Sequence, residues 1–456
     1  MNRLATFACV ALALTGCPQM PITDGGTGGG RGGGSGGGGG GLSPWGISDL
    51  DVDARDPTYF AIAVDPALER VGVAYFTPRG TETMMGTPDY DLKYLEWKQG
   101  SVVTPPQTIR YVQRKVGLAI AFHPSTGEPV VAYLGGAAGF VPGESIFWFQ
   151  SDAVINQRSN GSTWTETVIA TTGDQVSCGS LVSDRGLLVG LWPAIGFDGT
   201  GRLYLAYRDG HDGQFPQQDW GGSDVEVWEG VPPGTGKCVA AGGNNKKAYG
   251  GHVQMVMGPG EQPAIIFDQM PGTSDSNGNN VLFSKRNADG TWTQAGPVLN
   301  IGNTQTGASL AYDATEGFGI AVVDRTRDQL SYTNSADGLT WNAIQPVFGA
   351  GSGGWYPSLA MDPINHEPAI AFYNCSPRSS VSESNCTTTE DELVVSQRIA
   401  GQWRESVVDT EGGYHPKIGF FASGKRFVVY RTPNSINPDT GLKVPNAGQL
   451  KIAVER

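Results

Sequence analysis

One strand pattern recurs seven times along this chain, and it constrains the fold more than any other feature. A short apolar strand ends near an Asp, a Gly- or Pro-containing turn follows, and a second apolar strand ends in an aromatic residue, as in Phe60–Asp65 followed by Val71–Tyr75. Asp closes the first strand in four of the seven units. The first strands end near Asp65, His123, Asp198, Gly258, Asp313, Asp362 and Ala422, at intervals of 49 to 75 residues. Two apolar runs joined by a tight turn predict a β-hairpin.

Each hairpin is followed by a longer polar loop, a third strand and a fourth strand. The fourth strand is predicted to begin at a tryptophan in five units, at Trp97, Trp164, Trp292, Trp341 and Trp403. Four strands per unit at such a period predict the blades of a β-propeller, and therefore an all-β fold.

The last unit has three strands and ends at Arg456 without a tryptophan strand. The segment from Trp45 to Val52 has the pattern of an isolated fourth strand. We therefore expect seven blades, the last of them closed by the N-terminal strand. A six-bladed ring with an appended β-segment, or two smaller sheets, are the alternatives.

The sequence before the propeller divides into two segments. Residues 1–17 read as an export signal, because the apolar run from Leu4 to Leu14 is too short to span a bilayer as a mature helix. Residues 18–44 contain an almost pure glycine run from Gly25 to Gly41, which has no apolar surface with which to fold. We expect a flexible tether there, followed by the propeller in residues 45–456.

The tetrapeptide Leu14-Thr15-Gly16-Cys17 closes the signal and resembles the lipobox of bacterial lipoproteins. The resemblance implies that Cys17 receives lipid and anchors the protein to the cell envelope. Pro18 after the cysteine, where Asp would favour retention at the inner membrane, implies the outer membrane. An ordinary cleaved secretion signal is the alternative, and the sequence does not indicate which side of the membrane the propeller occupies.

Composition excludes some partners. The chain carries 31 basic and 44 acidic side chains, a formal net charge of −13, which disfavours binding to nucleic acid or to anionic lipid. Contact with the membrane is therefore expected only through the anchor, and we expect a monomer.

Four cysteines remain once Cys9 leaves with the signal and Cys17 is lipidated. An even number in an exported protein predicts disulfides. Cys375 and Cys386 enclose a short polar loop and form the favoured pair, which leaves Cys178 with Cys238.

Two turns resemble the Asp boxes of sialidase-type propellers, namely Ser335–Trp341 and the weaker Asn287–Trp292. Both depart from the usual spacing of that motif. The resemblance implies that Asp337 and Asp289 cap backbone N–H groups in turns between third and fourth strands, while the aromatic residue packs between sheets. Both aspartates would then belong to the scaffold.

Candidate ligand-binding residues lie where the second strands end. The loops that follow these strands are long, and loops on a rigid scaffold commonly carry function. Seven polar residues leave the second strands of five blades: Arg208, Asp209, Asp268, Asp324, Arg325, Asn374 and Arg431. Several arginines directed at one centre could hold a carboxylate. Alternatively, the arginines pair with Asp209 or Asp324.

No catalytic motif accompanies these residues. The five histidines are scattered without paired spacing, no Gly-x-Ser-x-Gly elbow occurs, and the early Arg-Ile-Pro signature of sialidases is missing. Tyr207 and Tyr430 are expected to pack in the core. No cofactor or catalytic metal is predicted, although the acidic run Asp49–Asp56 or the loop at 275–280 could supply oxygens to calcium.

The favoured hypothesis is a membrane-anchored, non-catalytic binding module for a glycan, peptide or envelope protein. The rival is a sialidase-like glycoside hydrolase acting on an acidic sugar, and an architectural envelope protein is a third alternative.

Overall fold

The computed structural model describes residues 44–52, 54, 59–78, 90–112, 117–135, 152–171, 189–209, 224–232, 237–242, 248–270, 280–293, 296–299, 307–324, 329–348, 354–375, 391–410, 412–432 and 448–456. Side chains are not described at 224, 237–242, 248, 249, 270, 299, 324, 375 and 391. The signal, Cys17, the tether, Cys178, Cys386 and Arg325 lie outside these ranges, as do the side chains of Cys238, Asp324 and Cys375.

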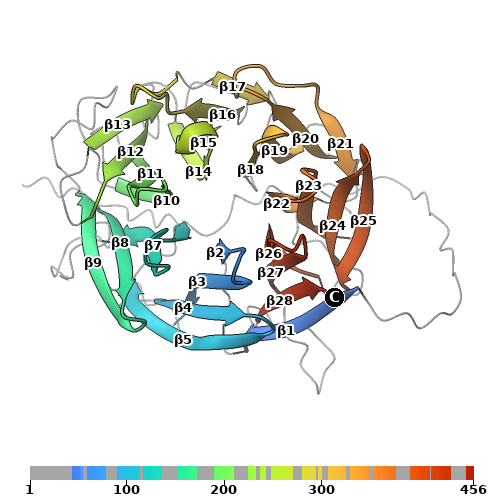
Figure 1. Ribbon diagram of the computed structural model, residues 1–456, viewed down its shortest axis with the longest axis horizontal. Coiled ribbons are helices and arrows are strands. Elements are labelled where there is room, and N and C mark those ends of the chain that lie inside the picture. Colours follow the sequence, from blue (N-terminus) through green and yellow to red (C-terminus); the bar gives the residue numbers. More distant parts are fainter. Residues whose placement is uncertain are drawn as a thin grey trace, which may run out of the picture. The chain divides into compact units, whose positions relative to one another are not determined.

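Seven four-stranded antiparallel sheets form a seven-bladed β-propeller, as the sequence predicts (Figure 1). In each blade the first strand lies innermost and the fourth lies at the rim. Blade 1 comprises β2 (Phe60–Asp65), β3 (Arg70–Pro78), β4 (Tyr90–Lys98) and β5 (Ser101–Val112). Blade 2 comprises β6 (Leu118–Phe122), β7 (Pro129–Gly135), β8 (Asp152–Ser159) and β9 (Thr163–Ala170). Blade 3 comprises β10 (Val189–Phe197), β11 (Leu203–Asp209), β12 (Asp224–Gly230) and β13 (Lys237–Gly242).

The remaining blades follow the same order. Blade 4 comprises β14 (Ala248–Met257), β15 (Pro263–Met270), β16 (Asn280–Lys285) and β17 (Gly296–Leu299). Blade 5 comprises β18 (Ala308–Asp313), β19 (Gly317–Asp324), β20 (Gln329–Ser335) and β21 (Gln345–Phe348). Blade 6 comprises β22 (Trp355–Met361), β23 (Pro368–Cys375), β24 (Asp391–Ile399) and β25 (Gln402–Asp409). Blade 7 comprises β26 (Tyr414–Phe420), β27 (Arg426–Arg431), β28 (Leu450–Glu455) and, from the other end of the chain, β1 (Trp45–Asp51).

The N-terminal strand closes the ring in the predicted way. β1 pairs antiparallel with β28, with Trp45 opposite Glu455. The Trp45 ring is 2% exposed, packs with side chains of blades 6 and 7, and lies 5.2 Å from the Arg426 guanidinium. Arg426 in turn donates to Glu455 at 2.6 Å. The two chain ends therefore hold the same blade together.

Recurring aspartates at the ends of first strands shape the first hairpin of a blade. The Asp198 carboxylate accepts the Thr200 N–H at 3.0 Å, and the Asp362 carboxylate accepts the Ile364 N–H at 2.8 Å. Such side-chain caps replace backbone hydrogen bonds that a tight turn cannot make. This explains the Asp that closes the first strand in four of the seven units.

The Asp-box turns have the role that their resemblance implies. Asp337 accepts the N–H groups of Leu339 and Thr340 at 2.8 and 3.0 Å, while Trp341 packs edge-on against Phe283 of the preceding blade. These backbone hydrogen bonds lower the pKa of Asp337. Asp289 accepts the Thr291 hydroxyl at 2.6 Å and its N–H at 2.9 Å, and the hydroxyl contact is the main cause of its lowered pKa.

The position predicted for Trp97 was wrong. Trp97 lies near the end of the third strand β4 and does not begin the fourth. The left-handed pair Gln99-Gly100 makes the turn after it, whereas Trp164 and Trp403 follow the corresponding turns of their blades. Trp97 instead stacks on Phe421 of blade 7, with ring centroids 5.9 Å apart.

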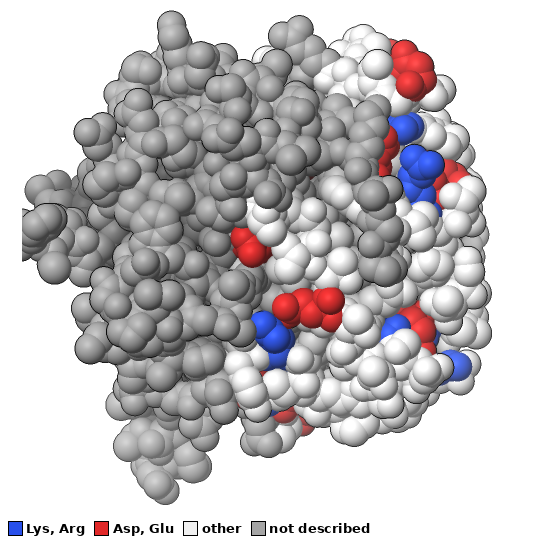
Figure 2. Space-filling model, turned by 90° about the vertical axis from the view of Figure 1, so that its left-hand side faces the viewer, with Lys and Arg blue, Asp and Glu red and all other residues white. Residues whose placement is uncertain are grey.

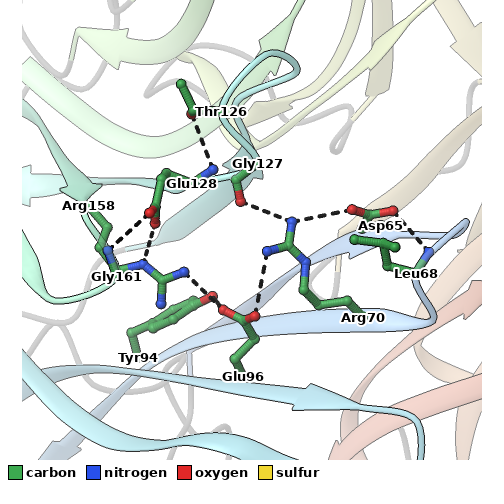
Figure 3. Close-up of polar contacts among 10 residues, drawn as sticks. All are labelled: Asp65, Leu68, Arg70, Tyr94, Glu96, Thr126, Gly127, Glu128, Arg158 and Gly161. Atoms are coloured by element: carbon green, nitrogen blue, oxygen red, sulfur yellow. Dashed lines mark hydrogen bonds and ion pairs between the residues drawn. The ribbon is translucent and has the colours of Figure 1, made fainter.

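Buried ion pairs join neighbouring blades at the end of the ring where the first hairpins turn (Figure 3). Arg158 of blade 2 donates to Glu128 at 2.6 Å and to Glu96 of blade 1 at 3.0 Å, and its guanidinium lies 5.1 Å from the Tyr94 ring. Burial, reinforced by Glu96, raises the pKa of Tyr94. Charges buried in this way are tolerated because each is paired.

The same arrangement recurs at two more junctions. Arg286 contacts Glu229, Gln262 and the Tyr204 ring, and Arg398 contacts Glu316, Glu367 and the Tyr332 ring. Basic and acidic side chains also lie beside each other on the side of the molecule drawn in Figure 2. Charge is therefore interspersed over the part of this side that the structure describes.

Replacing Trp45 tests the closure of the ring. Trp45→Ala should lower the free energy of unfolding by about 3–5 kcal/mol, because it empties a packed site between blades. Urea unfolding followed by tryptophan fluorescence measures the loss. Ile47→Ala, on the same strand but 43% exposed, should change stability by less than about 1 kcal/mol. Equal effects of the two substitutions would contradict the closure.

Candidate functional site: the channel mouth

The candidate site lies at the end of the central channel where the second strands finish. In blades 3, 4, 6 and 7 the innermost strand carries a β-bulge at this end, seen as a shift in its register with the second strand. The bulged residues Trp192, His252, Tyr356 and His415 have φ of 45°, 49°, 55° and 51°. We call these four residues the aromatic collar.

Left-handed backbone is unfavourable for bulky side chains and costs on the order of 1–3 kcal/mol at each position. A glycine two residues earlier makes the bulge sterically feasible. A Cβ on Gly190 would lie 2.7 Å from the Ala153 Cα, and one on Gly354 would lie 2.7 Å from the Leu330 Cβ. The strand therefore passes against the preceding blade and turns its next-but-one residue toward the mouth.

The collar forms two groups of rings. Trp192 of blade 3 and His252 of blade 4 have ring centroids 5.9 Å apart. Tyr356 of blade 6 and His415 of blade 7 lie 4.0 Å apart, and Tyr414 lies 6.4 Å from Tyr356. All of these rings are partly buried, so each retains some accessible surface. Bulges that re-aim a side chain are common beside functional sites.

Strand register brings several of the predicted polar residues beside this collar. Leu191 pairs with Arg208, Gly251 with Asp268 and Tyr414 with Arg431. The Arg208 guanidinium lies 5.5 Å from the Trp192 ring, and that of Arg431 lies 5.7 Å from the Tyr414 ring. Cation–π contact of this kind holds an aromatic ring in place.

Asp268 forms the shortest of these polar contacts. One of its carboxylate oxygens lies 2.8 Å from His252 Nδ1, and the carboxylate is 4% exposed while the His252 side chain is 36% exposed. An ionised carboxylate can only accept, so Nδ1 carries the proton. Nε2 is the second polar atom of the ring, and it accepts a hydrogen bond when the imidazole is neutral and donates one when it is protonated.

Two buried polar atoms beside the collar have no partner among the described residues. They are the indole N–H of Trp192, a donor, and Oδ1 of Asn374, an acceptor. The amide nitrogen of Asn374 donates to Glu392 at 3.2 Å. Buried polar groups are normally satisfied, so these two atoms are exceptions, but neither has surface that a ligand could reach.

Arg208 and Asp209 are each 1% exposed. Burial lowers the pKa of Arg208 to about 10, and the Asp209 carboxylate acts in the opposite direction. Arg208 stands on blade 3 and Arg431 on blade 7, each against a ring of its own blade. Asp324 ends β19. Its side chain, like all of Arg325, lies outside the described residues, so the predicted three-arginine group is described only in part.

Tyrosines on the second strands belong to the scaffold. Tyr207 donates to Glu226 at 2.8 Å, and Tyr430 donates to Asp409 at 2.6 Å. Equivalent pairs join Tyr75 to Asp51 and Tyr133 to Glu166. Tyr207, Glu226 and Tyr430 are all 0% exposed. The four tyrosines are at most 1% exposed, so packing explains a tyrosine–carboxylate pair that recurs in this way.

No group of three or more His, Cys, Asp or Glu within the described ranges is arranged to hold a metal ion. The same part of the chain contains no helix long and apolar enough to cross a membrane.

The collar was missed in the sequence, although a signal for it exists. Gly190-Leu-Trp-Pro193, Gly354-Trp-Tyr-Pro357 and Gly413-Tyr-His-Pro416 share the pattern Gly-x-aromatic-Pro, and Gly250-Gly-His-Val253 departs from it only in the last residue. The pattern lies at the beginning of the first strand in each of these four blades.

No protein-family model and no curated protein matches the chain. Solved structures that resemble it include a protein of unknown function from Dyadobacter fermentans, 10% identical with a TM-score of 0.45, covering 90% of this chain and 98% of that one. AofleA from Arthrobotrys oligospora is 10% identical with a TM-score of 0.43, covering 81% and 90%. The Hadza microbial sialidase Hz136 is 12% identical with a TM-score of 0.46, covering 85% and 76%. At these identities the likeness extends to the propeller fold alone.

Proposed function

We propose that the propeller is a non-catalytic binding module that takes a glycan at the aromatic collar. The observation that carries this proposal is the set of four bulges, each of which holds an aromatic or imidazole ring in a strained backbone conformation at the channel mouth. Strain of this kind is retained where a side chain must be held in one place. Rings with one accessible face can stack on the apolar faces of sugar rings.

One polar group of the collar can bind a hydroxyl group of a sugar. It is Nε2 of His252, the ring nitrogen that Asp268 does not contact. Few, well-placed polar groups around an apolar surface are typical of small-molecule sites. A peptide or an envelope protein remains the alternative ligand.

The same residues argue against the sialidase-like rival. The two tyrosines weighed as nucleophiles, Tyr207 and Tyr430, are fully buried and pair with carboxylates. Arg208 and Arg431 lie against aromatic rings of their own blades.

A glycan array probed with the full chain, purified in detergent, tests the proposal. Trp192→Ala and Tyr356→Ala should each weaken binding of the best glycan by about 2 kcal/mol, roughly thirtyfold, as loss of a central aromatic contact does. Tyr111→Ala, which removes a 53% exposed ring on the outer strand β5, is the matched control and should bind as the parent does.

Circular dichroism would verify that each variant is folded. Glycan binding that survives both collar substitutions would refute the proposed site. Turnover of a glycoside by the parent protein would refute the non-catalytic assignment.

We further propose that lipid on Cys17 anchors this module in the envelope, with the glycine-rich segment as a spacer. Treated as a flexible coil, residues 18–44 span roughly 30 Å, from about 5–6 Å times the square root of length. That reach would carry the collar clear of the lipid head groups.

Replacing the lipid-accepting residue tests the anchor. Cells fed an alkyne fatty acid should label the parent protein, and Cys17→Ser should lose both the label and the membrane association. Cys9→Ser, inside the signal, should retain both. A labelled Cys17→Ser protein in the membrane fraction would show that the anchor lies elsewhere.

A further inference from the structure

Polar side chains connect the inner strands of blades 4 to 7 across the channel wall. The Ser309 hydroxyl accepts the Leu359 N–H at 2.9 Å, and the Ser358 hydroxyl accepts the Ile418 N–H at 3.1 Å. In each case a side chain of one inner strand binds a backbone donor on the free edge of the next inner strand. An edge strand has backbone groups that need a partner other than a neighbouring strand.

Gln254 of blade 4 shows which chemical group fits such an edge. Its Oε1 accepts the Leu310 N–H at 3.1 Å, and its Nε2 donates to the Ala308 carbonyl at 2.6 Å. The side-chain carboxamide therefore binds the edge of β18 with one acceptor and one donor, as the backbone of a further strand would. An amide group is thus complementary to the free edge of an inner strand.

The corresponding residues of blades 2 to 4 direct their backbone polar groups toward the channel. The His123 N–H donates to the Glu128 carbonyl at 2.9 Å and closes the first hairpin of blade 2. Hydrogen-bonded and non-hydrogen-bonded pairs alternate along an antiparallel ladder, so the residue three positions earlier faces away from the second strand. The same spacing before the closing N–H holds in blades 3 and 4, and the three residues are Ile120, Ile195 and Met255. Each lies on an inner strand that is paired on one side only (Figure 1).

No side chain in the part of the chain that the structure describes caps these three N–H groups. Blades 4 to 6 carry an amide or a hydroxyl at the position that reaches the next inner strand. At the same position blades 1 to 3 carry Ala61, Ala119 and Ala194. A methyl group cannot accept a hydrogen bond, so the edges of β6, β10 and β14 remain available.

A cavity of about 310 Å³ lies beside these three edges. It is lined by residues 62–64, 120–122, 195–197 and 255–257, from the inner strands of blades 1 to 4. None of the lining residues has a polar side chain. An apolar cavity of roughly 150 Å³ admits benzene, so this space is large enough for a small organic molecule. Its wall combines backbone amide groups with apolar side chains.

We propose that this cavity binds a short peptide, whose backbone amides pair with the free strand edges as the Gln254 carboxamide pairs with β18. In strand addition of this kind, main-chain hydrogen bonds give affinity and the side chains give specificity. Phe122, Phe197 and Met257, which border the cavity and are partly exposed, would contact an apolar side chain of the peptide. This site goes beyond the glycan site at the aromatic collar and does not depend on it.

Calorimetry and thermal unfolding of the full chain, purified in detergent, with N-acetylleucinamide test the proposal. N-acetylleucine dimethylamide is the ligand control, because it keeps both carbonyl acceptors and the side chain but lacks the terminal N–H donors. N-acetylleucinamide should raise the melting temperature. The dimethylamide should bind at least about fivefold more weakly, which corresponds to the loss of one neutral hydrogen bond. Absence of stabilisation by N-acetylleucinamide, or equal binding of the two compounds, would overturn the proposal.

A substitution that copies the cap of blade 4 tests where the ligand binds. Ala61→Gln places a carboxamide before the Ile120 edge, as Gln254 is placed before Leu310. It should raise the melting temperature without ligand and weaken N-acetylleucinamide at least about fivefold, because the side chain occupies an edge that the ligand uses. Ser309→Ala, which removes a cap between blades 5 and 6 outside the cavity, should lower the melting temperature and keep the parent affinity. An Ala61→Gln protein that binds N-acetylleucinamide as the parent does would contradict the site.

Discussion

Burial of apolar surface between neighbouring blades is the interaction on which the rest of the structure depends. Each of the seven junctions contains its own apolar cluster, to which two successive blades contribute. A four-stranded blade has two apolar faces, so a single blade would leave both exposed to water. Only a closed ring covers every face. The strand at Trp45 is needed for that closure, because the C-terminal part of the chain supplies three strands to blade 7.

The polar groups at the two ends of the channel have different roles. At the end where first hairpins turn, aspartate caps and the Arg–Glu–Tyr contacts between blades use polar groups to fix the scaffold. At the other end, polar groups accompany strained rings, as in the pair His252 and Asp268. The carboxylate there is buried and orients a ring that stays accessible. The polar contacts between blades at the hairpin end thus hold the ring in which the strained residues of the aromatic collar are set.

Much of the fold follows from the sequence because a propeller is a repetition of local patterns. The hairpins, the number of blades and the closing strand at Trp45 depend on alternation and turn residues within short stretches. Trp97 was assigned to the wrong strand because the turn at Gln99-Gly100 comes after it. A tryptophan before this turn belongs to the third strand, and one after it belongs to the fourth. Six of the seven candidate polar residues lie at the ends of second strands, a position that is also local, and Arg325 lies outside the described residues.

Partners across strands and blades could not be predicted in the same way. Pairing of Asp268 with His252 requires the register of β14 with β15, which a bulge shifts. The Gly-x-aromatic-Pro pattern is visible in the sequence. That it marks a β-bulge can be recognised only from the register of the folded strands.

The central claim is that four bulges present Trp192, His252, Tyr356 and His415 at the mouth of one closed ring. A crystal structure of the protein at a resolution that defines backbone angles tests it most directly. The account predicts φ near +50° at all four residues and rings that border the same opening. Ordinary extended strands at these positions, with the rings turned between the blades, would contradict it.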